Sequence, residues 1–188
     1  IYGRPTQSIE RWRAELTEAL ARAPEHMSLY QLTIEPDTMF ERLERAGKLV
    51  MPSLDIQRDL WDVTQNMMSK AGMPAYEISN HARPGAESRH NLVYWRYGEY
   101  VGVGPGAHGR FVEDGTRVVT IAERRPESWL AMVEQAGHGI TGGESLTREE
   151  EADEFLLMGL RLAEGIDLVR YERLAGRPLS SRRIALLQ

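Results

Sequence analysis

Residues 27–34 read MSLYQLTI, a short run of apolar and β-branched side chains bounded by Pro24 and Pro36. Such a run predicts a β-strand, because its side chains suit a pleated surface and the prolines limit its length. Residues 75–79, AYEIS, form a second run of this kind. Helical patterns precede and separate the two runs, and this alternation predicts an α/β fold with a parallel sheet and crossover helices.

Apolar residues at helical spacing define the helices that surround these strands. Ser8 is a suitable N-cap for a helix over about residues 9–22, and Ser53 for a helix over about residues 54–71. A shorter helix is expected over residues 39–46. In parallel sheets, ligands sit outside the carboxyl ends of the strands, so the strand ends at Thr33 and at Ser79-Asn80 should face one ligand site.

The second half of the chain has a different pattern. Residues 110–112 and 117–121 flank Asp114-Gly115 and predict a β-hairpin, followed by a helix that opens at Pro126. Residues 141–144 predict a linker. Thr147 to Glu150 fits a capping box for a helix that stops at Gly165, and further helices are expected after Asp167 and over residues 180–188. We therefore expect a domain boundary near residue 144.

The densest chemistry lies in residues 76–108, which hold three of the five histidines, closely spaced glycines and the pattern HNLVYW at residues 90–95. A neutral imidazole can ligate iron, and Arg83 could pair with a carboxylate. Taken alone, the histidine and aromatic pair of HNLVYW is more often packing at a loop than a ligand site, and its position after a strand end, beside His81 and Arg83, favours a site. The glycines at residues 102–106 do not match a dinucleotide fingerprint, and they fit either a tight turn or a backbone wall against a nucleoside.

Composition excludes several classes of protein. The chain has 23 Lys and Arg against 28 Asp and Glu, a net charge of −5, and therefore no general basic footprint for nucleic acid. No apolar run approaches the roughly 20 residues of a membrane-spanning helix. The absence of cysteine excludes disulfides and any cysteine-ligated metal built from these residues alone. Both ends look cut, since Ile1 is no initiator and a helix is in progress at the last residue, so a fragment is expected.

Five short motifs occur in order: IYGRP at 1–5, SLYQLTIEP at 28–36, YEISNHA at 76–82, HNLVYW at 90–95 and GPGAH at 104–108. With LLMGLRLAEGI at residues 156–166, they closely resemble the radical SAM proteins of the oxygen-independent coproporphyrinogen III oxidase-like family, specifically its heme-chaperone branch. Each motif is weak by itself, but the ordered set is specific and covers essentially the whole chain.

The resemblance implies a fold and a set of cofactors. Residues 1–144 would form the second half of a radical SAM partial (β/α) barrel with a following insert, and residues 145–188 the truncated start of a mainly helical C-terminal domain. The full-length protein would hold a [4Fe–4S] cluster on three cysteines and S-adenosylmethionine (SAM) on the open iron of that cluster. Those cysteines are absent from this sequence, so no cluster ligand is expected here.

The same resemblance assigns candidate site residues. Those expected on the SAM side are Thr33, Gly106, Ala107 and His108, and those expected on the heme side are His81, Arg83, His90, Asn91, Tyr94 and Trp95.

Specific roles follow for the heme side. His90 or His81 would contact the heme iron, Tyr94 and Trp95 would pack against the macrocycle, and Arg83 would lie near a propionate. The resemblance implies a cytoplasmic heme chaperone that passes heme to an acceptor protein. The alternative is an oxygen-independent coproporphyrinogen III oxidase, which decarboxylates propionates by radical abstraction. The shared barrel motifs do not separate the two, and the acceptor, the mode of heme attachment and the oligomeric state stay open.

Overall fold

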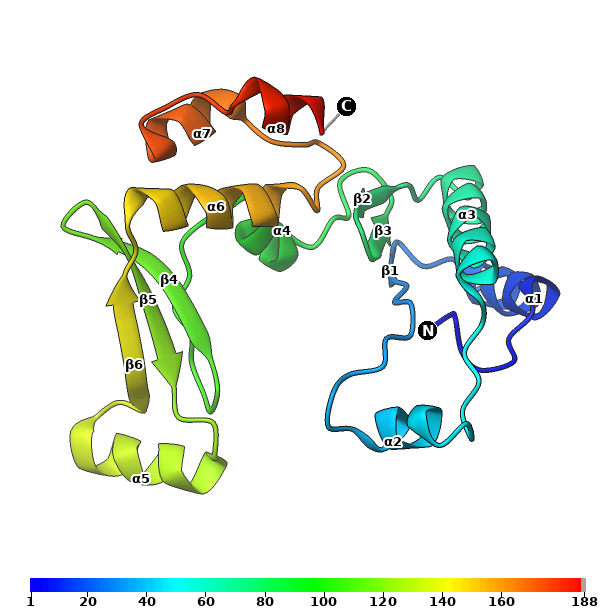
Figure 1. The fold of residues 1–188 in the computed structure, drawn as a ribbon, viewed down its shortest axis with the longest axis horizontal. Coiled ribbons are helices and arrows are strands. Elements are labelled where there is room, and N and C mark those ends of the chain that lie inside the picture. The colour runs from blue at the N-terminus through cyan, green and yellow to red at the C-terminus, as the bar shows by residue number, and fades with distance from the viewer. Residues whose placement is uncertain (187–188) are drawn as a thin grey trace. The chain divides into compact units, whose positions relative to one another are not determined.

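The computed structural model describes residues 1–186, which divide into two compact units. Unit 1 comprises Ile1–Ser88, and unit 2 begins at Arg89. Each unit has an apolar core of its own and combines helices with β-strands (Figure 1). The compact units divide between Ser88 and Arg89. The domain boundary expected near residue 144 is a separate expectation and stays a prediction.

Two amphipathic helices, α1 (Ile9–Leu20) and α3 (Leu54–Lys70), pack together in unit 1 (Figure 1). Both predicted caps are confirmed, since the hydroxyls of Ser8 and Ser53 accept hydrogen bonds from backbone N–H groups in the first turns. Trp12 Nε1 donates to Thr64 Oγ1 over 2.7 Å and joins the two helices inside the core. The buried core members are Tyr2, Trp12, Leu16, Leu29, Leu60, Val63, Met68 and Met73. The short helix α2 (Met39–Arg45) buries no residue.

The sheet of unit 1 corrects the predicted strand pairing. Strands β1 (His26–Ser28), β2 (Ala75–Glu77) and β3 (Asn80–Ala82) pair antiparallel in the order β1-β3-β2. The chain reverses at residues 78–79 because the Glu77 carboxylate accepts hydrogen bonds from Ser79 N and Asn80 Nδ2, which stabilises a turn where the sequence indicated a strand end. Parallel pairing does occur beside this sheet, as an isolated bridge between Tyr2 and Gln31.

In unit 2, strands β4 (His108–Glu113), β5 (Thr116–Ala122) and β6 (Ile140–Ser145) form an antiparallel sheet in that order. The predicted hairpin is confirmed, and Asp114 and Gly115 have the two positive φ values, 50° and 78°, that a two-residue type I′ turn requires. Strand β6 contains the residues expected to be a linker. A Cβ at Gly143 would lie 2.8 Å from Val119 O, so this glycine permits the close approach of β6 to β5.

Helices cover the two ends of this sheet. Helix α5 (Pro126–Ala136) lies at one end, and α6 (Arg148–Gly159) lies at the other (Figure 1). The predicted capping box at Thr147 and Glu150 is confirmed, although α6 stops at Gly159 rather than at Gly165. Helix α7 (Leu168–Ala175) packs on α6, and α8 (Ser181–Ala185) follows. The helix expected to reach residue 188 includes residues 187–188, which lie outside the described part.

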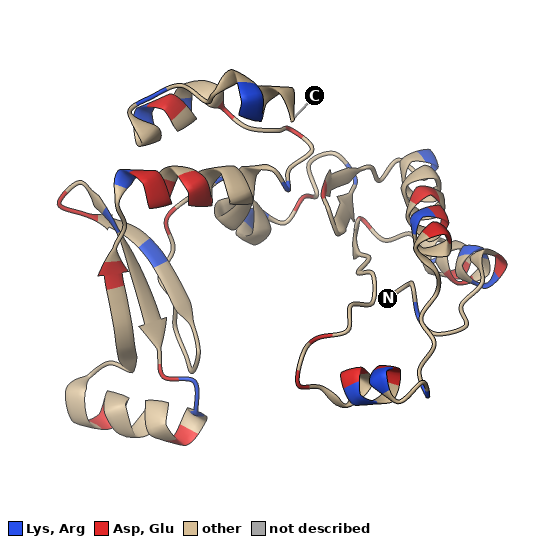
Figure 2. Cartoon of the chain, viewed as in Figure 1, with Lys and Arg blue, Asp and Glu red and all other residues tan. Residues whose placement is uncertain are grey.

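Helix α4 (Arg89–Trp95) also belongs to unit 2 and lies next to α6 (Figure 1). The buried core of this unit comprises Tyr97, Ala152, Phe155, Tyr171 and Leu179. Acidic and basic residues alternate along α1, α2 and α3, whereas the first turn of α6 is acidic (Figure 2). No helix within residues 1–186 has both the length and the apolar character needed to cross a membrane.

Candidate functional site

Residues 90–95, HNLVYW, form most of helix α4. The sequence pattern alone fits either packing or a ligand site. Because helical residues four apart share a face, His90 and Tyr94 meet there. His90 Nε2 and Tyr94 Oη are 2.8 Å apart, and the two rings meet edge to face with centroids 4.7 Å apart. The imidazole of His90 is exposed, so this pair can be reached by a ligand without rearrangement of the core.

A third ring extends this face. Tyr100 meets Tyr94 edge to face at 4.4 Å, and its backbone bridges to Arg110 of β4. Burial is the main cause of the raised pKa of Tyr100. We call His90, Tyr94 and Tyr100 the aromatic row. Tyr100 is not apparent as a site residue from the sequence, because the pairing of residue 100 with β4 is what brings its ring to α4.

Trp95 lies apart from the aromatic row. The guanidinium of Arg161 stands 4.3 Å from the centre of its ring, and the indole Nε1 is buried without a hydrogen-bond partner among the described residues. Trp95 also lines a cavity of about 190 Å³ together with Phe155 and Ile166. One face of this ring is therefore taken by the chain itself. Asn91 is half-buried on the same helix and has contacts of its own.

The segment expected on the SAM side runs into β4. Gly106 N donates to Glu123 O over 2.7 Å, and Ala107 O accepts from Ala122 N over 2.9 Å, so this backbone is bonded to the end of β5 and the residue after it. His108 begins β4 and is exposed. A Cβ at Gly102 would lie 2.3 Å from His108 O. The chain's own backbone therefore explains the glycine at residue 102.

The remaining predicted site residues, Thr33, His81 and Arg83, belong to unit 1. Thr33 and Arg83 are exposed, and Arg83 N donates to Glu25 O. His81 is only 1% exposed, in the middle strand of the sheet, and neither ring nitrogen has a hydrogen-bond partner in the described structure. Burial lowers its pKa. An enclosed imidazole of this kind is less suited to a transferable ligand than the exposed His90.

Glu77, whose orientation the sequence left undecided, is buried at 1% exposure beside His81. Its carboxylate accepts the two hydrogen bonds that form the β2–β3 turn, and Asn80 in turn accepts from the hydroxyl of Ser28. Buried carboxylates are retained when their lone pairs are satisfied in this way. Glu77 therefore has a structural role at the turn.

Residues for a resident metal cofactor are not assembled in this chain. Within the described residues, no three or more His, Cys, Asp or Glu side chains are grouped so as to hold a metal ion. The sequence also contains no cysteine. The residues of this chain therefore do not supply the cysteine thiolates that hold an iron–sulfur cluster.

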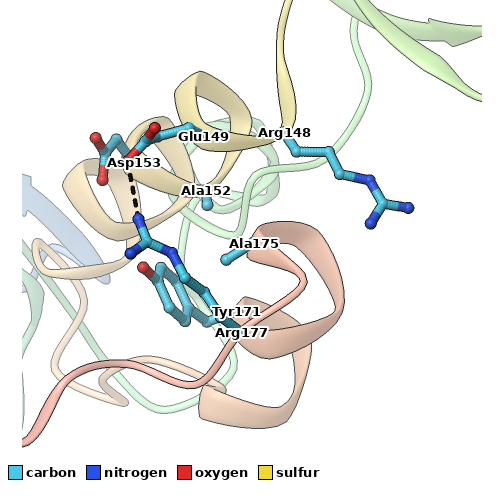
Figure 3. A pocket seen from close by; sticks show the side chains of 7 residues that line it. All are labelled: Arg148, Glu149, Ala152, Asp153, Tyr171, Ala175 and Arg177. Atoms are coloured by element: carbon cyan, nitrogen blue, oxygen red, sulfur yellow. Dashed lines mark hydrogen bonds and ion pairs between the residues drawn. The ribbon is translucent and has the colours of Figure 1, made fainter.

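A second cavity, of about 310 Å³, lies between α6 and α7 (Figure 3). Glu149 and Asp153 of α6 face Arg177 across it, beside the ring of Tyr171. Arg177 Nη2 pairs with Glu149 Oε1 at 2.8 Å, and Arg183 Nη1 pairs with Asp153 Oδ1 at 3.2 Å. Both carboxylates are thus already neutralised by arginines of the chain, which leaves the aromatic row as the stronger candidate site.

Comparison with known proteins gives a consistent set of similarities. The family model "HemN C-terminal domain" matches residues 146–183. "Radical S-adenosyl methionine domain-containing protein 1, mitochondrial" of Mus musculus is 39% identical over 170 residues, which are 88% of this chain and 38% of the relative. "Heme chaperone HemW" of Synechocystis sp. is 39% identical over 171 residues, 88% of this chain and 40% of the relative.

The fold has a counterpart among solved structures. The coproporphyrinogen III oxidase (HemN) of Escherichia coli, described as a radical SAM enzyme, superposes with a TM-score of 0.69 over 93% of this chain and 42% of its own, at 18% identity. The predicted α/β class and the assignment to the C-terminal part of a radical SAM fold are thereby confirmed. This chain spans less than half of the length of each of these relatives.

Proposed function

Because the chain belongs to the HemW-like radical SAM family, we propose that its protein is a heme chaperone, which binds heme and passes it to an acceptor protein. The observation that carries this proposal is the aromatic row, in which the exposed His90 and the half-buried Tyr94 of α4 are hydrogen-bonded to each other. An exposed ligand site suits a protein that must release its heme again, because release from an enclosed pocket requires opening of the fold.

In the proposed complex, His90 is the iron ligand. Iron binding requires a neutral ring nitrogen, and in the free chain Nε2 of His90 is within hydrogen-bond distance of Tyr94 Oη. Ligation through Nε2 would replace this hydrogen bond, and the ring of Tyr94 would then be available to pack on the macrocycle. Tyr100 lies edge-on to Tyr94 and gives the macrocycle a second ring to pack against.

The other heme-side residues have lesser parts in the proposal. Arg83 and His81 belong to unit 1, and the heme-side roles expected of them stay predictions of the resemblance; the imidazole of His81 is enclosed. Trp95 contacts heme only through the face that Arg161 leaves uncovered. Asn91 lies on α4 with His90 and Tyr94 and is proposed to belong to the heme side.

Cluster and SAM binding are proposed for the whole protein. The cluster thiolates would come from residues other than those of this chain, which has no cysteine. The SAM-side roles of Thr33, in unit 1, and of Gly106, Ala107 and His108, in unit 2, stay predictions of the resemblance. We propose the cytoplasm as the location of the protein; some relatives carry the word mitochondrial in their names.

The second candidate function is coproporphyrinogen III oxidation, supported by the fold shared with the oxidase of Escherichia coli. Anaerobic incubation of the whole protein with coproporphyrinogen III, SAM and a reductant separates the two functions. A chaperone leaves the porphyrinogen unchanged and binds added heme in a saturable manner. Formation of protoporphyrinogen IX would assign the oxidase function instead, and a protein that neither binds heme saturably nor decarboxylates would refute both.

A further inference from the structure

Tyr97, two residues beyond the last turn of α4, has an unusual backbone. Its φ is +54°, in the left-handed region that glycine normally occupies at the end of a helix. Gly98 N donates to Val93 O over 2.7 Å, and Tyr97 N donates to Tyr94 O over 2.9 Å. These two bonds are the Schellman pattern, with Tyr97 at the position that disfavours any side chain.

The carbonyl groups at this helix end are held by arginines from distant elements. Arg170 of α7 donates to Arg96 O over 2.6 Å and to Tyr97 O over 2.7 Å. Arg117 of β5 donates to Gly98 O over 3.3 Å. Cations at the carboxyl end of a helix also complement its partial negative charge.

The side chain of Tyr97 is held as firmly as its backbone. It is 3% exposed, and its hydroxyl donates to Glu154 Oε2 over 3.0 Å. Arg110 binds the same carboxylate through two nitrogens, at 3.2 and 3.1 Å. The guanidinium of Arg117 lies 4.1 Å from the centre of the Tyr97 ring and pairs with Glu151 at 3.1 Å.

A strained residue persists only where its surroundings over-determine it, and such residues gather at functional sites. Here the hydrogen bond from Tyr97 N ends on the carbonyl of Tyr94, the central ring of the aromatic row. We infer that Tyr97 is a positioning residue, which the buried Arg117 and the clamp of Arg170 hold in place so that α4 presents His90 and Tyr94 in one fixed geometry. This inference rests on the proposed function, since it names what sets the geometry of the heme ligand.

The arrangement also links two parts of unit 2. Glu151, Glu154 and Arg170 come from α6 and α7, within the segment that matches the HemN C-terminal domain. They fix the end of a helix that precedes that segment by more than 50 residues. The C-terminal segment thereby acts on the candidate site without supplying a ligand to it.

The test compares Arg170→Ala and Arg170→Lys with Arg173→Ala, which removes an exposed charge one turn along α7. The first readout needs no heme: amide hydrogen exchange of α4. We expect faster exchange in Arg170→Ala, partial rescue in Arg170→Lys, whose single ammonium reaches fewer carbonyls, and no change in Arg173→Ala. Wild-type exchange in Arg170→Ala would overturn the inference, whatever the outcome with heme.

The second readout is heme titration of the same variants. We expect Arg170→Ala to bind heme about tenfold more weakly, the size of one lost charge-assisted hydrogen bond, and with a displaced Soret band. Equal losses in Arg170→Ala and Arg173→Ala would indicate a general charge effect and refute positioning. If the wild-type protein binds no heme but amide exchange in α4 still becomes faster in Arg170→Ala, the proposed heme-chaperone function is refuted. The inference that Arg170 holds the end of α4 is then still supported.

Tyr97→Gly provides an independent check on the role of the ring. Glycine relieves the strain at φ +54° but also removes a buried ring from the core of unit 2, so only a loss of protection in α4 that exceeds the loss in the rest of unit 2 indicates positioning. A positioning residue would lose its anchor on Glu154, and we expect faster exchange in α4 and a broadened Soret band. Slower exchange in α4 with an unchanged band would contradict the inference.

Discussion

Thr64 offers a sharp test of how unit 1 is held together. Its hydroxyl donates to Leu60 O over 2.7 Å and accepts from Trp12 Nε1 over 2.7 Å, and the residue is fully buried. Thr17 on α1 makes the same hydroxyl-to-carbonyl bond, to Arg13 O over 2.7 Å, but is exposed and accepts nothing from an indole. Valine at either position removes the hydrogen bond from the hydroxyl to the carbonyl four residues earlier. Only Thr64→Val also leaves the buried N–H of Trp12 without an acceptor.

The expected difference in stability between the two variants follows from the indole N–H of Trp12, which loses its acceptor only in Thr64→Val. A buried donor left unsatisfied costs about 1–3 kcal/mol, so Thr64→Val should lower the free energy of unfolding of unit 1 by that much more than Thr17→Val. Amide hydrogen exchange of α1 and α3 peptides measures this free energy locally. In a Trp12→Phe background the donor is absent, and the difference should vanish. Equal destabilisation by both valines in the Trp12 background would refute the reasoning.

Three further outcomes are expected. Burial lowers the pKa of His81, so unit 1 should be fully stable above about pH 6.5 and lose stability as the pH falls, by at most about 1.4 kcal/mol per pH unit. His81→Leu should remove this dependence in urea titrations, and His138→Ala at an exposed site should keep it. Gly102→Ala should destabilise unit 2 by about 1–3 kcal/mol in thermal unfolding, because its Cβ meets His108 O, whereas Gly142→Ala should be tolerated. Thr147→Ala should cost about 1 kcal/mol through loss of the capping box, seen as faster amide exchange in α6.

The helices of this chain were predictable because their signals are local. Ser8, Ser53 and Thr147 cap helices within three residues of their own positions, and apolar spacing identifies the buried faces. The Asp114-Gly115 turn was equally readable, since only a few residue pairs accept two positive φ values.

Strand pairing was less predictable, because it depends on residues far apart in the chain. Strands β2 and β3 are each three residues long and separated by a turn that a buried carboxylate stabilises. Sequence spacing alone gives no sign that Glu77 is buried. The glycines of β6 resembled a linker because nothing in the sequence reports their close approach to Val119.

The candidate site was predicted in part. His90 and Tyr94 were expected on one surface, and the structure brings them together. Trp95 was expected to join them, but Arg161, which is 66 residues further along the chain, covers one face of its ring. The positive φ of Tyr97 has no sequence signal, since tyrosine rarely adopts it.

Heme titration of two matched histidine variants tests the central claim most directly. His90 and His138 are both exposed residues of unit 2, and only His90 belongs to the aromatic row. The account predicts that His90→Ala weakens heme binding by at least about tenfold and shifts the Soret band, while His138→Ala matches wild type. Wild-type affinity and an unchanged Soret band in His90→Ala would contradict the claim that α4 carries the heme ligand.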